Sequence, residues 1–541
     1  MVRLVPSLLF ALLPAFIHAQ DYTLIKASAI YTADKSFSKH EAMVVAKGNI
    51  LFTGTADSAG KLYPNAVLKD YSGKYIVPGF IDAHCHFLAW CRGMKECDLT
   101  GTTSAARVVK KVKKFSPSTQ RQWIVGRGWD QNDWKDKKYP SLNALDKAFP
   151  NKPVCLKRID GHAVWINSAA ARAIHLNTDT MIAGGEILKE NGKFTGILVD
   201  NATSLVEPYI PPLPRDEYLD AIAKGLRLCY AKGLTTLDEA GLEPADINFI
   251  DSLQKAGAMD MRIYAMLSAS EPNLSWLFNH GMTHTDRLNV RSVKFYLDGA
   301  LGSRGALLKH DYCDRAGHRG LQLMTSAQFF SWSSYLYNLG MQVCVHAIGD
   351  SANALAMRTF KKILLPGYDS RWRIEHAQIF DPVDFKLWAD HNVIPSVQPT
   401  HATSDAPWAT SRICAARLPG AYAYKTLLQQ AGMLALGTDF PVEDINPLHT
   451  FYSAVTRLDA NGKLKEPFLP NQGLTREETL WGMTAWAAYS NFEESVKGSL
   501  EPGKVADFVV LDSDLMQVPE KKIPKVKVVA TYIGGKQVYA K

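Results

Sequence analysis

Residues 78–86 read Pro-Gly-Phe-Ile-Asp-Ala-His-Cys-His, and this stretch decides the fold more than any other. Its apolar residues predict a buried strand over 75–86. Side chains two positions apart share one face of a strand, so His84 and His86 can bind one metal ion. Two unrelated histidines in a polar loop are the alternative. Cys85 points to the opposite face, and we interpret it as a packing residue rather than a ligand.

Seven further short apolar runs follow, and most neighbours are separated by room for one helix and two loops. Strands that alternate with helices indicate a parallel sheet. Eight such strands predict an α/β fold of the (β/α)8, or TIM barrel, class. After residues 75–86, the predicted barrel strands are 235–240, 261–268, 292–299, 341–348, 371–378, 393–398 and 433–440.

The predicted barrel spans residues 76–496, and its first gap, of about 150 residues, is too long for a single crossover. We therefore predict an α/β insertion over about 95–215, with strands at 123–126 and 154–157. Short alternating runs broken by glycine turns occupy both chain ends, residues 20–75 and 497–541. We expect these two ends to meet in space as one small β-sandwich.

Four more ionisable residues fall at the ends of predicted strands: Lys294, His346, His376 and Asp439. The carboxyl ends of the strands form the active-site face of a parallel barrel, so these side chains are candidate site residues. Each has a structural alternative. Lys294 can hold its ammonium in solvent, His346 and His376 can be hydrogen-bonded core residues, and Asp439 can cap the next helix.

The six residues together balance the charge of two divalent cations. A buried, neutral lysine reacts with carbon dioxide, and the resulting carbamate on Lys294 is an anion that can bridge two metal ions. Imidazole is the commonest zinc ligand. We therefore predict one or two divalent metal ions per chain, with zinc preferred, and Asp439 as both ligand and general base. The predicted metal ligands are His84, His86, Lys294, His346, His376 and Asp439.

The composition is that of a globular enzyme, with 47% hydrophobic and 21% charged residues among 541. The net charge of +8 is spread along the chain, and its densest cluster, within 110–114, is interpreted as a solvated helix face. The alternative, a nucleic-acid patch, is disfavoured. We expect a small-molecule substrate and no nucleic-acid partner.

Residues 1–19 have the features of a signal peptide: Arg3, then an apolar run too short to span a bilayer, then Ala19 before a plausible cleavage point. We therefore expect a periplasmic or secreted protein with no membrane anchor after cleavage. The eight cysteines are scattered singly, and most are predicted to be small buried residues. Export permits a disulfide, and the spacing does not select its partners.

The chain resembles the amidohydrolase superfamily and, within it, the amidohydrolase 3 subgroup that includes N-substituted formamide deformylases. Besides the metal positions, the matching segments are 128–130 (Gly-Trp-Asp), 161–168 (Gly-His-Ala-Val-Trp-Ile-Asn-Ser), 298–304 (Asp-Gly-Ala-Leu-Gly-Ser-Arg), 398–401 (Gln-Pro-Thr-His) and 498–507 (Gly-Ser-Leu-Glu-Pro-Gly-Lys-Val-Ala-Asp). The resemblance implies the barrel and the sandwich of both chain ends.

The resemblance also implies how the ligands are shared. His84, His86, Lys294 and Asp439 would hold the more buried metal ion, Lys294, His346 and His376 would hold the other, and Asp439 would shuttle the proton. It further implies that the insertion covers the barrel mouth. A homodimer is an open expectation for this fold.

Four residues outside the metal set are candidates for the substrate site. His162 is a candidate catalytic residue that hydrogen-bonds the substrate or a developing oxyanion, with a structural loop histidine as the alternative. Arg304 would pair with a substrate carboxylate or with Asp298. His401 is a further substrate-binding candidate, and Trp129 would form an apolar wall or pack in a core.

These residues predict a metal-dependent amidohydrolase that uses metal-activated water to cleave a carbon–nitrogen bond other than a peptide bond. Two alternatives stay open. A deaminase or an ester or lactone hydrolase would use the same centre. A binding protein that had lost catalysis would keep the barrel, and the presence of all six ligand residues disfavours it.

Overall fold

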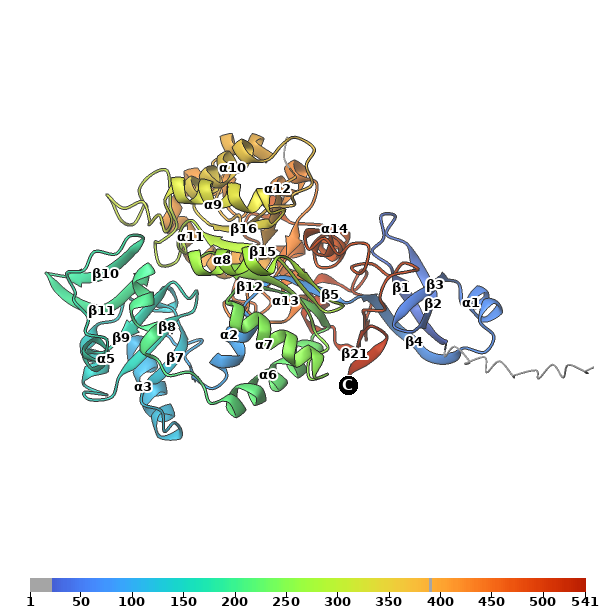
Figure 1. Cartoon of the computed structure of the whole chain (residues 1–541), viewed down its shortest axis with the longest axis horizontal. Coiled ribbons are helices and arrows are strands. Elements are labelled where there is room, and N and C mark those ends of the chain that lie inside the picture. The colour runs from blue at the N-terminus through green and yellow to red at the C-terminus, as the bar shows by residue number, and fades with distance from the viewer. Residues whose placement is uncertain (1–21, 389–391) are drawn as a thin grey trace, which may run out of the picture.

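The computed structural model describes residues 22–388 and 392–541. A sheet built from both chain ends lies at one end of the molecule, a barrel in the centre, and the insertion at the other end (Figure 1). The predicted signal peptide, 1–19, lies outside the described residues. In the described ranges no helix combines the length and hydropathy needed to cross a membrane.

Eight parallel strands form the central barrel, and each pairs in parallel with the next. In order they are β5 (Phe80–Cys85), β12 (Leu234–Leu242), β13 (Arg262–Ser268), β15 (Leu288–Tyr296), β16 (Gln342–Ala347), β17 (Arg373–His376), β18 (Ile394–Val397) and β19 (Ala435–Leu436). The barrel is nearly closed, because the Asp439 backbone N–H donates to the His84 carbonyl oxygen at 2.7 Å across the last seam. The predicted barrel class is confirmed.

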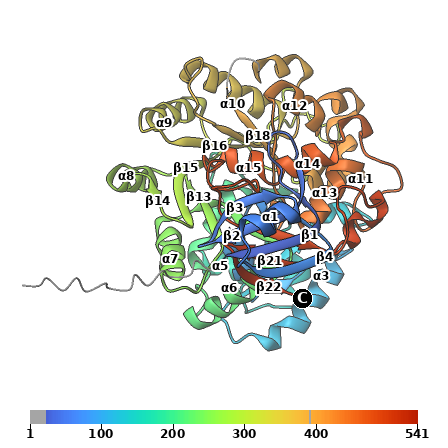
Figure 2. The same cartoon turned by 90° about the vertical axis from the view of Figure 1, so that its right-hand side faces the viewer.

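Helices follow the strands and surround the barrel (Figure 2). Because they cover the outer face, strands such as β5 and β16 are buried along their whole length. The helices are α6 (Arg215–Tyr230), α7 (Pro244–Lys255), α8 (Glu271–His280), α9 (Ser326–Asn338), α10 (Asp350–Ile363), α11 (Pro399–Ile413), α12 (Tyr424–Ala431), α13 (Pro447–Thr456), α14 (Arg476–Gly482) and α15 (Ala485–Ser490).

The strand predicted over 75–86 is two strands that meet at Gly79. β4 (Val67–Pro78) belongs to the sheet of the chain ends, whereas β5 belongs to the barrel. The Gly79 N–H donates to the Asp507 carbonyl oxygen in the first sheet, and the next N–H, that of Phe80, donates to Gly233 beside the barrel. A Cβ atom on Gly79 would lie 2.3 Å from Thr235 Oγ1, so this crossing requires glycine.

Both chain ends contribute to one seven-stranded sheet, in the order β22-β21-β20-β4-β1-β2-β3. Its other strands are β1 (Thr23–Tyr31), β2 (Lys39–Ala46), β3 (Asn49–Gly54), β20 (Phe508–Leu511), β21 (Val528–Ile533) and β22 (Lys536–Ala540), and α1 (Ala56–Leu62) follows β3. The predicted meeting of the two ends is seen here. All seven strands are hydrogen-bonded into a single sheet, whereas a β-sandwich consists of two packed sheets. The sandwich therefore stays a prediction.

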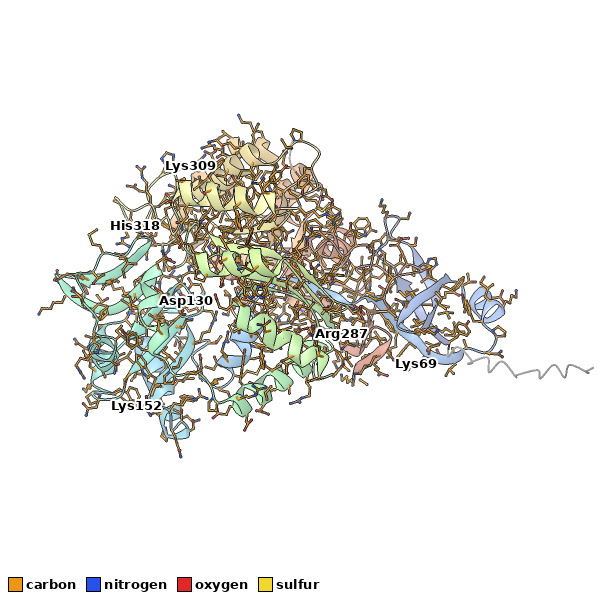
Figure 3. All side chains as sticks on the ribbon, in the orientation of Figure 1. Lys69, Asp130, Lys152, Arg287, Lys309 and His318 are labelled. Carbon is orange, nitrogen blue, oxygen red and sulfur yellow. A yellow bond between two sulfur atoms is a disulfide. The ribbon has the colours of Figure 1, made fainter. Side chains whose placement is uncertain are left out.

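The predicted insertion holds a six-stranded sheet in the order β10-β11-β9-β8-β7-β6. The strands are β6 (Cys97–Asp98), β7 (Ile124–Trp129), β8 (Val154–Arg158), β9 (Ala163–Ile166), β10 (Gly185–Glu190) and β11 (Lys193–Asp200). Short helices accompany them, namely α3 (Ala105–Phe115), α4 (Leu142–Asp146) and α5 (Ser168–Ala173), whereas α2 (Phe87–Gly93) precedes the insertion and packs against α6. Asp130 lies where this part of the chain meets the barrel (Figure 3).

Candidate metal centre

The six predicted ligands converge at the carboxyl ends of the barrel strands. His84 lies near the end of β5, with His86 just after it, Lys294 lies in β15, His346 in β16, His376 at the end of β17, and Asp439 three residues after β19. Five of the six are fully or nearly fully buried, and the His86 side chain is 25% exposed. The parallel barrel therefore brings together residues that lie up to 355 positions apart (439 − 84).

One group of possible ligand atoms belongs to His84, His86 and Asp439. Asp439 Oδ1 lies 3.2 Å from His86 Nε2 and 3.8 Å from His84 Nε2. Lys294 Nζ lies 3.1 Å from the same His84 nitrogen. These are the four residues assigned by resemblance to the more buried ion, and the structure places them around one point.

A second group lies beside the first. The His376 ring centroid is 4.8 Å from that of His84 and 4.6 Å from that of His346. His346 Nε2 faces Gly299 O at 3.5 Å, which leaves its Nδ1 as the free ring nitrogen. His401, from α11, joins this region, because its Nε2 lies 3.4 Å from Asp439 Oδ2. His401, His376 and Asp439 thus form another possible set of metal ligands.

Three histidines of the centre are held through Nδ1 by a fixed acceptor. His84 Nδ1 lies 2.5 Å from Glu375 Oε2, His86 Nδ1 lies 3.0 Å from Ala240 O, and His376 Nδ1 lies 2.7 Å from Gln398 Oε1. Such partners orient a ligating imidazole, fix its tautomer and leave Nε2 as the ligand atom. The sequence analysis missed Glu375 and Gln398. Glu375 was visible as a carboxylate within an otherwise buried barrel strand.

Glu375 belongs to a buried ion network below the centre. Arg373 Nε donates to Glu375 Oε1 at 2.7 Å, and Arg373 Nη1 donates to Asp238 Oδ2 at 2.9 Å. All three side chains are completely buried. Burial alone would raise the pKa of Glu375, but Arg373 and His84 hold that pKa well below its usual range. Glu375 is therefore a carboxylate that attracts the proton of His84 Nδ1.

Burial favours the neutral form at four of the nitrogen ligands, those of His84, Lys294, His346 and His376. It lowers the pKa of His84 to about 4 and the pKa values of His346 and His376 well below the usual histidine value. It also lowers the pKa of Lys294 to about 8. Neutral imidazole is the form that binds metal, and neutral amine is the form that reacts with carbon dioxide.

The donor set fits a divalent metal ion. Among the described residues, buried Asp439 Oδ1 and His401 Nε2 have no hydrogen-bond partner, although other polar atoms lie within 3.4 Å. Buried polar atoms are nearly always paired, so such atoms at the focus of several histidines indicate a place for a cation. Backbone strain agrees with a functional role, because His376 (φ 72°) and Asp439 (φ 60°) adopt the left-handed conformation.

A cavity of about 1210 Å³ opens over this centre and is lined by both the barrel and the insertion. His162 reaches it from the loop between β8 and β9, with its ring centroid 5.1 Å from that of His346. Its Nδ1 lies 2.7 Å from Asp200 Oδ1. Burial favours neutral His162, but Asp200 raises its pKa above the usual value. The structure thus brings His162 and His401 to the predicted site.

Two predicted substrate contacts lie elsewhere. Trp129 is fully buried in the core of the insertion, where its indole N–H donates to Leu156 O at 2.7 Å, and it does not line the cavity. Arg304 also lies outside the lining and pairs with Asp314 at 2.9 Å instead of with Asp298. The Asp298 carboxylate is taken by backbone N–H groups, including those of Ile348 and Gly349.

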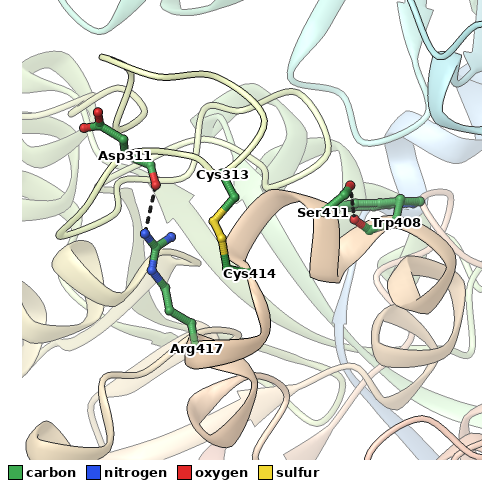
Figure 4. The surroundings of a disulfide bond; sticks show 6 residues. All are labelled: Asp311, Cys313, Trp408, Ser411, Cys414 and Arg417. Carbon is green, nitrogen blue, oxygen red and sulfur yellow. Dashed lines mark hydrogen bonds between the residues drawn. A yellow bond between two sulfur atoms is a disulfide. The ribbon is translucent and has the colours of Figure 1, made fainter.

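The cysteines behave as packing residues with one exception. Cys85 is completely buried on the face of β5 away from the metal ligands, and its Sγ lies 3.8 Å from Glu239 Oε2. Cys313 and Cys414 form a disulfide with a Cα–Cα distance of 5.8 Å (Figure 4). This bond joins the loop after β15 to the end of α11, the helix that carries His401.

Comparison with known proteins agrees with this geometry. The model of the amidohydrolase family, in its amidohydrolase 3 subgroup, matches residues 69–539. A metal-dependent hydrolase of Pyrococcus horikoshii, described as uncharacterized, superposes with a TM-score of 0.76 at 26% identity and covers 92% of this chain and 99% of its own. Fold and site thus define a metal-dependent hydrolase.

The chain belongs to the amidohydrolase family. It is similar to the protein LONG AFTER FAR-RED 3 of Arabidopsis thaliana, at 31% identity over 95% of this chain and 91% of that protein. It is also similar to YtcJ of Bacillus subtilis (29% identity; 95% and 98% covered). The N-substituted formamide deformylase of Arthrobacter pascens is 24% identical, with 95% and 98% covered.

Proposed function

We propose that this chain hydrolyses a non-peptide carbon–nitrogen bond of a small amide. The placement of Asp439 carries the proposal, since its carboxylate faces two histidines of the centre and the cavity at once. An amine is a poor leaving group unless it is protonated, so amide hydrolysis needs a residue that moves a proton across the scissile bond. A relative named as a deformylase of N-substituted formamides supports the same bond type.

The ligand set fits zinc, as imidazole and carboxylate donors favour it among common divalent ions. We propose that His84, His86, Lys294 and Asp439 hold one ion, and that Lys294, His346 and His376 hold a second. A bound divalent ion would polarise the substrate carbonyl and lower the pKa of water. Buried Lys294, with its pKa lowered to about 8, supports its conversion to a bridging carbamate.

The protein side chains then have distinct tasks. The water oxygen bonds to the amide carbon while Asp439 takes the water proton, and Asp439 returns that proton to nitrogen as the carbon–nitrogen bond breaks. His162 has its Nδ1 engaged by Asp200, so its Nε2 is left to bind the substrate carbonyl oxygen. The insertion helps to enclose the cavity, which limits access of other solvent molecules.

We also propose that the protein works outside the cytoplasm on a small molecule, without a nucleic-acid partner. The disulfide between Cys313 and Cys414 supports export, because such bonds persist in oxidising compartments. The predicted signal peptide supports the same conclusion.

The test combines metal content with a substrate panel. Purified chain lacking residues 1–19, incubated with zinc and bicarbonate, should hold one or two metal ions and release amine from N-formyl and N-acyl amines. Asp439→Asn should lower kcat about 100-fold or more, the usual range for loss of an acid–base group. Ammonia release from heterocycles, or lactone hydrolysis without amide cleavage, would favour the rival hydrolases. Protein that takes up no metal would instead be a binding protein.

A further inference from the structure

The cations that line the cavity differ in whether they have partners. Lys157 Nζ pairs with Glu207 at 3.0 Å, and Arg158, which is fully buried, pairs with Asp130 at 2.5 Å and with Asp160. Lys294 belongs to the metal centre, and Lys463 is exposed at the rim. That leaves Arg127, which in the described part of the chain has no carboxylate within ion-pair distance.

The Arg127 side chain is partly buried, and one of its terminal nitrogens is fixed by a hydrogen bond. It lies in β7, and its Nη2 donates to Ile159 O at 2.9 Å, while its Nε is buried without a partner. The backbone around it is closely packed, because Leu99 N–H donates to Arg127 O and a Cβ on Gly128 would lie 2.5 Å from Thr100 Oγ1. A fixed guanidinium with unused N–H donors is suited to bidentate binding of a planar anion such as a carboxylate.

Arg127 lines the same cavity as Lys294 and Asp439 of the metal centre. Burial lowers the pKa of Arg127, and the strongest opposing influence is Asp439, ahead of Glu96 and Asp160. Arginine stays protonated in proteins, so the charge persists. Of the nearby carboxylates, Asp130 and Asp160 are both taken by Arg158, and Glu96 lies beyond ion-pair distance of Arg127.

We propose that Arg127 binds a carboxylate of the substrate, so that this site selects amides that carry an acidic group, such as N-acyl amino acids. The inference rests on the proposed amide hydrolysis and names its substrate class. A partly buried guanidinium without a partner has lost hydration free energy. An anionic substrate compensates for that loss by pairing with the guanidinium, whereas a neutral amide leaves it unpaired.

The experiment compares matched substrates that differ in one carboxylate. N-formylphenylalanine and N-formylphenethylamine have the same amide and ring, and only the first is anionic. The variants are Arg127→Gln, Arg127→Lys, which keeps the charge but loses the planar fork, and Lys463→Gln, which removes a rim cation as the matched control. Binding of N-formylphenylalanine to metal-free protein, measured by calorimetry, gives a readout that is independent of turnover.

We expect wild type to prefer the anionic substrate in kcat/KM, and Arg127→Gln to reduce that preference about 100-fold, mainly through KM, as for loss of a buried charge partner. Arg127→Lys should recover part of the preference, and Lys463→Gln should leave it unchanged. Calorimetric binding of N-formylphenylalanine should weaken in parallel in Arg127→Gln.

An equal loss for both substrates, or an unchanged preference, would overturn the assignment while leaving amide hydrolysis intact. If neither substrate is cleaved but wild type binds N-formylphenylalanine more tightly than Arg127→Gln does, the anion site stands and the proposed reaction fails. If wild type neither cleaves nor binds the anionic compound, the anion site is overturned as well. Thermal melting of each variant confirms that the protein compared is folded.

Discussion

At the scale of single residues, burial determines the chemistry of this site. Lys294 is 1% exposed, and loss of hydration destabilises its ammonium form. Glu375 is equally buried but keeps its charge, because Arg373 and His84 stabilise the carboxylate. Burial thus makes the neutral amine of Lys294 accessible at much lower pH than in an ordinary lysine, whereas Glu375 stays a fixed anion.

The first residue-scale prediction concerns Lys294. Because its pKa is lowered to about 8, half of its amine is neutral near that pH, whereas an ordinary lysine reaches this point near pH 10.4. At constant dissolved carbon dioxide, carboxylation of metal-free protein should therefore fall as pH drops through 8. NMR with 13C-labelled bicarbonate measures the carbamate carbon. The signal should be absent in Lys294→Met, and a midpoint above pH 10 would contradict the prediction.

The second concerns Glu375. Glu375→Gln removes the anion that holds His84 Nδ1, so metal affinity should fall about 10- to 100-fold, as for other partners of ligating histidines. Competition with a chelator measures this affinity. Asp238→Asn is the matched control, because Asp238 also pairs with Arg373 but touches no ligand histidine. Equal metal loss in both variants would mean that Glu375 acts only through the stability of the barrel.

At the scale of elements, the strand ends and α11 place the site. β17 ends at His376 in a left-handed conformation, and α11 begins at Pro399 and presents His401 within its first turn. The far end of α11 is tied down by the disulfide between Cys414 and Cys313 and by Arg412, which donates to Asn132 of the insertion at 2.7 Å. One helix therefore links the metal centre, the loop after β15 and the insertion.

The element-scale prediction is that the disulfide stabilises this arrangement. It closes a separation of 101 residues, and disulfides over such loops contribute about 2–4 kcal/mol to the free energy of unfolding. The double variant Cys313→Ser/Cys414→Ser should lose about that amount in denaturant titrations. Reductant should lower the stability of wild type to the same level and leave the double variant unchanged. A wild type that does not respond to reductant would contradict the prediction.

At the scale of the whole molecule, the two ends of the barrel contact different parts of the chain. The sheet of both chain ends lies at the amino ends of the barrel strands, and the insertion lies at the opposite, catalytic end (Figure 1). A buried ion pair joins the sheet to the barrel, since Arg262 Nε in β13 donates to Asp507 Oδ2 at 2.6 Å. Asp507 also accepts from Gly534 N–H at 2.7 Å, so one carboxylate connects three segments.

The whole-molecule prediction tests this junction. Asp507→Ala leaves Arg262 buried and unpaired, so the free energy of unfolding should fall by about 3–5 kcal/mol. The metal centre is at the other end of the barrel, so kcat per folded, metal-loaded molecule should be retained. Asp57→Asn breaks an exposed pair with Lys61 and should cost at most about 1 kcal/mol. A similar small loss in Asp507→Ala would show that the junction contributes little.

Local periodicity allowed much of the fold and the ligand set to be predicted. Apolar runs of strand length located all eight barrel strands, and the spacing of His84 and His86 placed both on one face. The boundary at Gly79 was missed, because an apolar run shows that a strand is buried but does not show which sheet it joins. The roles of Trp129 and Arg304 were assigned to the substrate site for a similar reason, since a motif does not show where a side chain points.

The sequence by itself determined the barrel, the order of its strands and the residue types that end them, because these follow from the local alternation of apolar and polar residues. Only the tertiary structure decided the partners: Glu375 on His84 across 291 positions, Cys414 rather than another cysteine for Cys313, and an unpaired Arg127 beside the cavity. Such contacts depend on how the barrel closes and how the insertion packs on it. They are set by long-range geometry that no short stretch of sequence encodes.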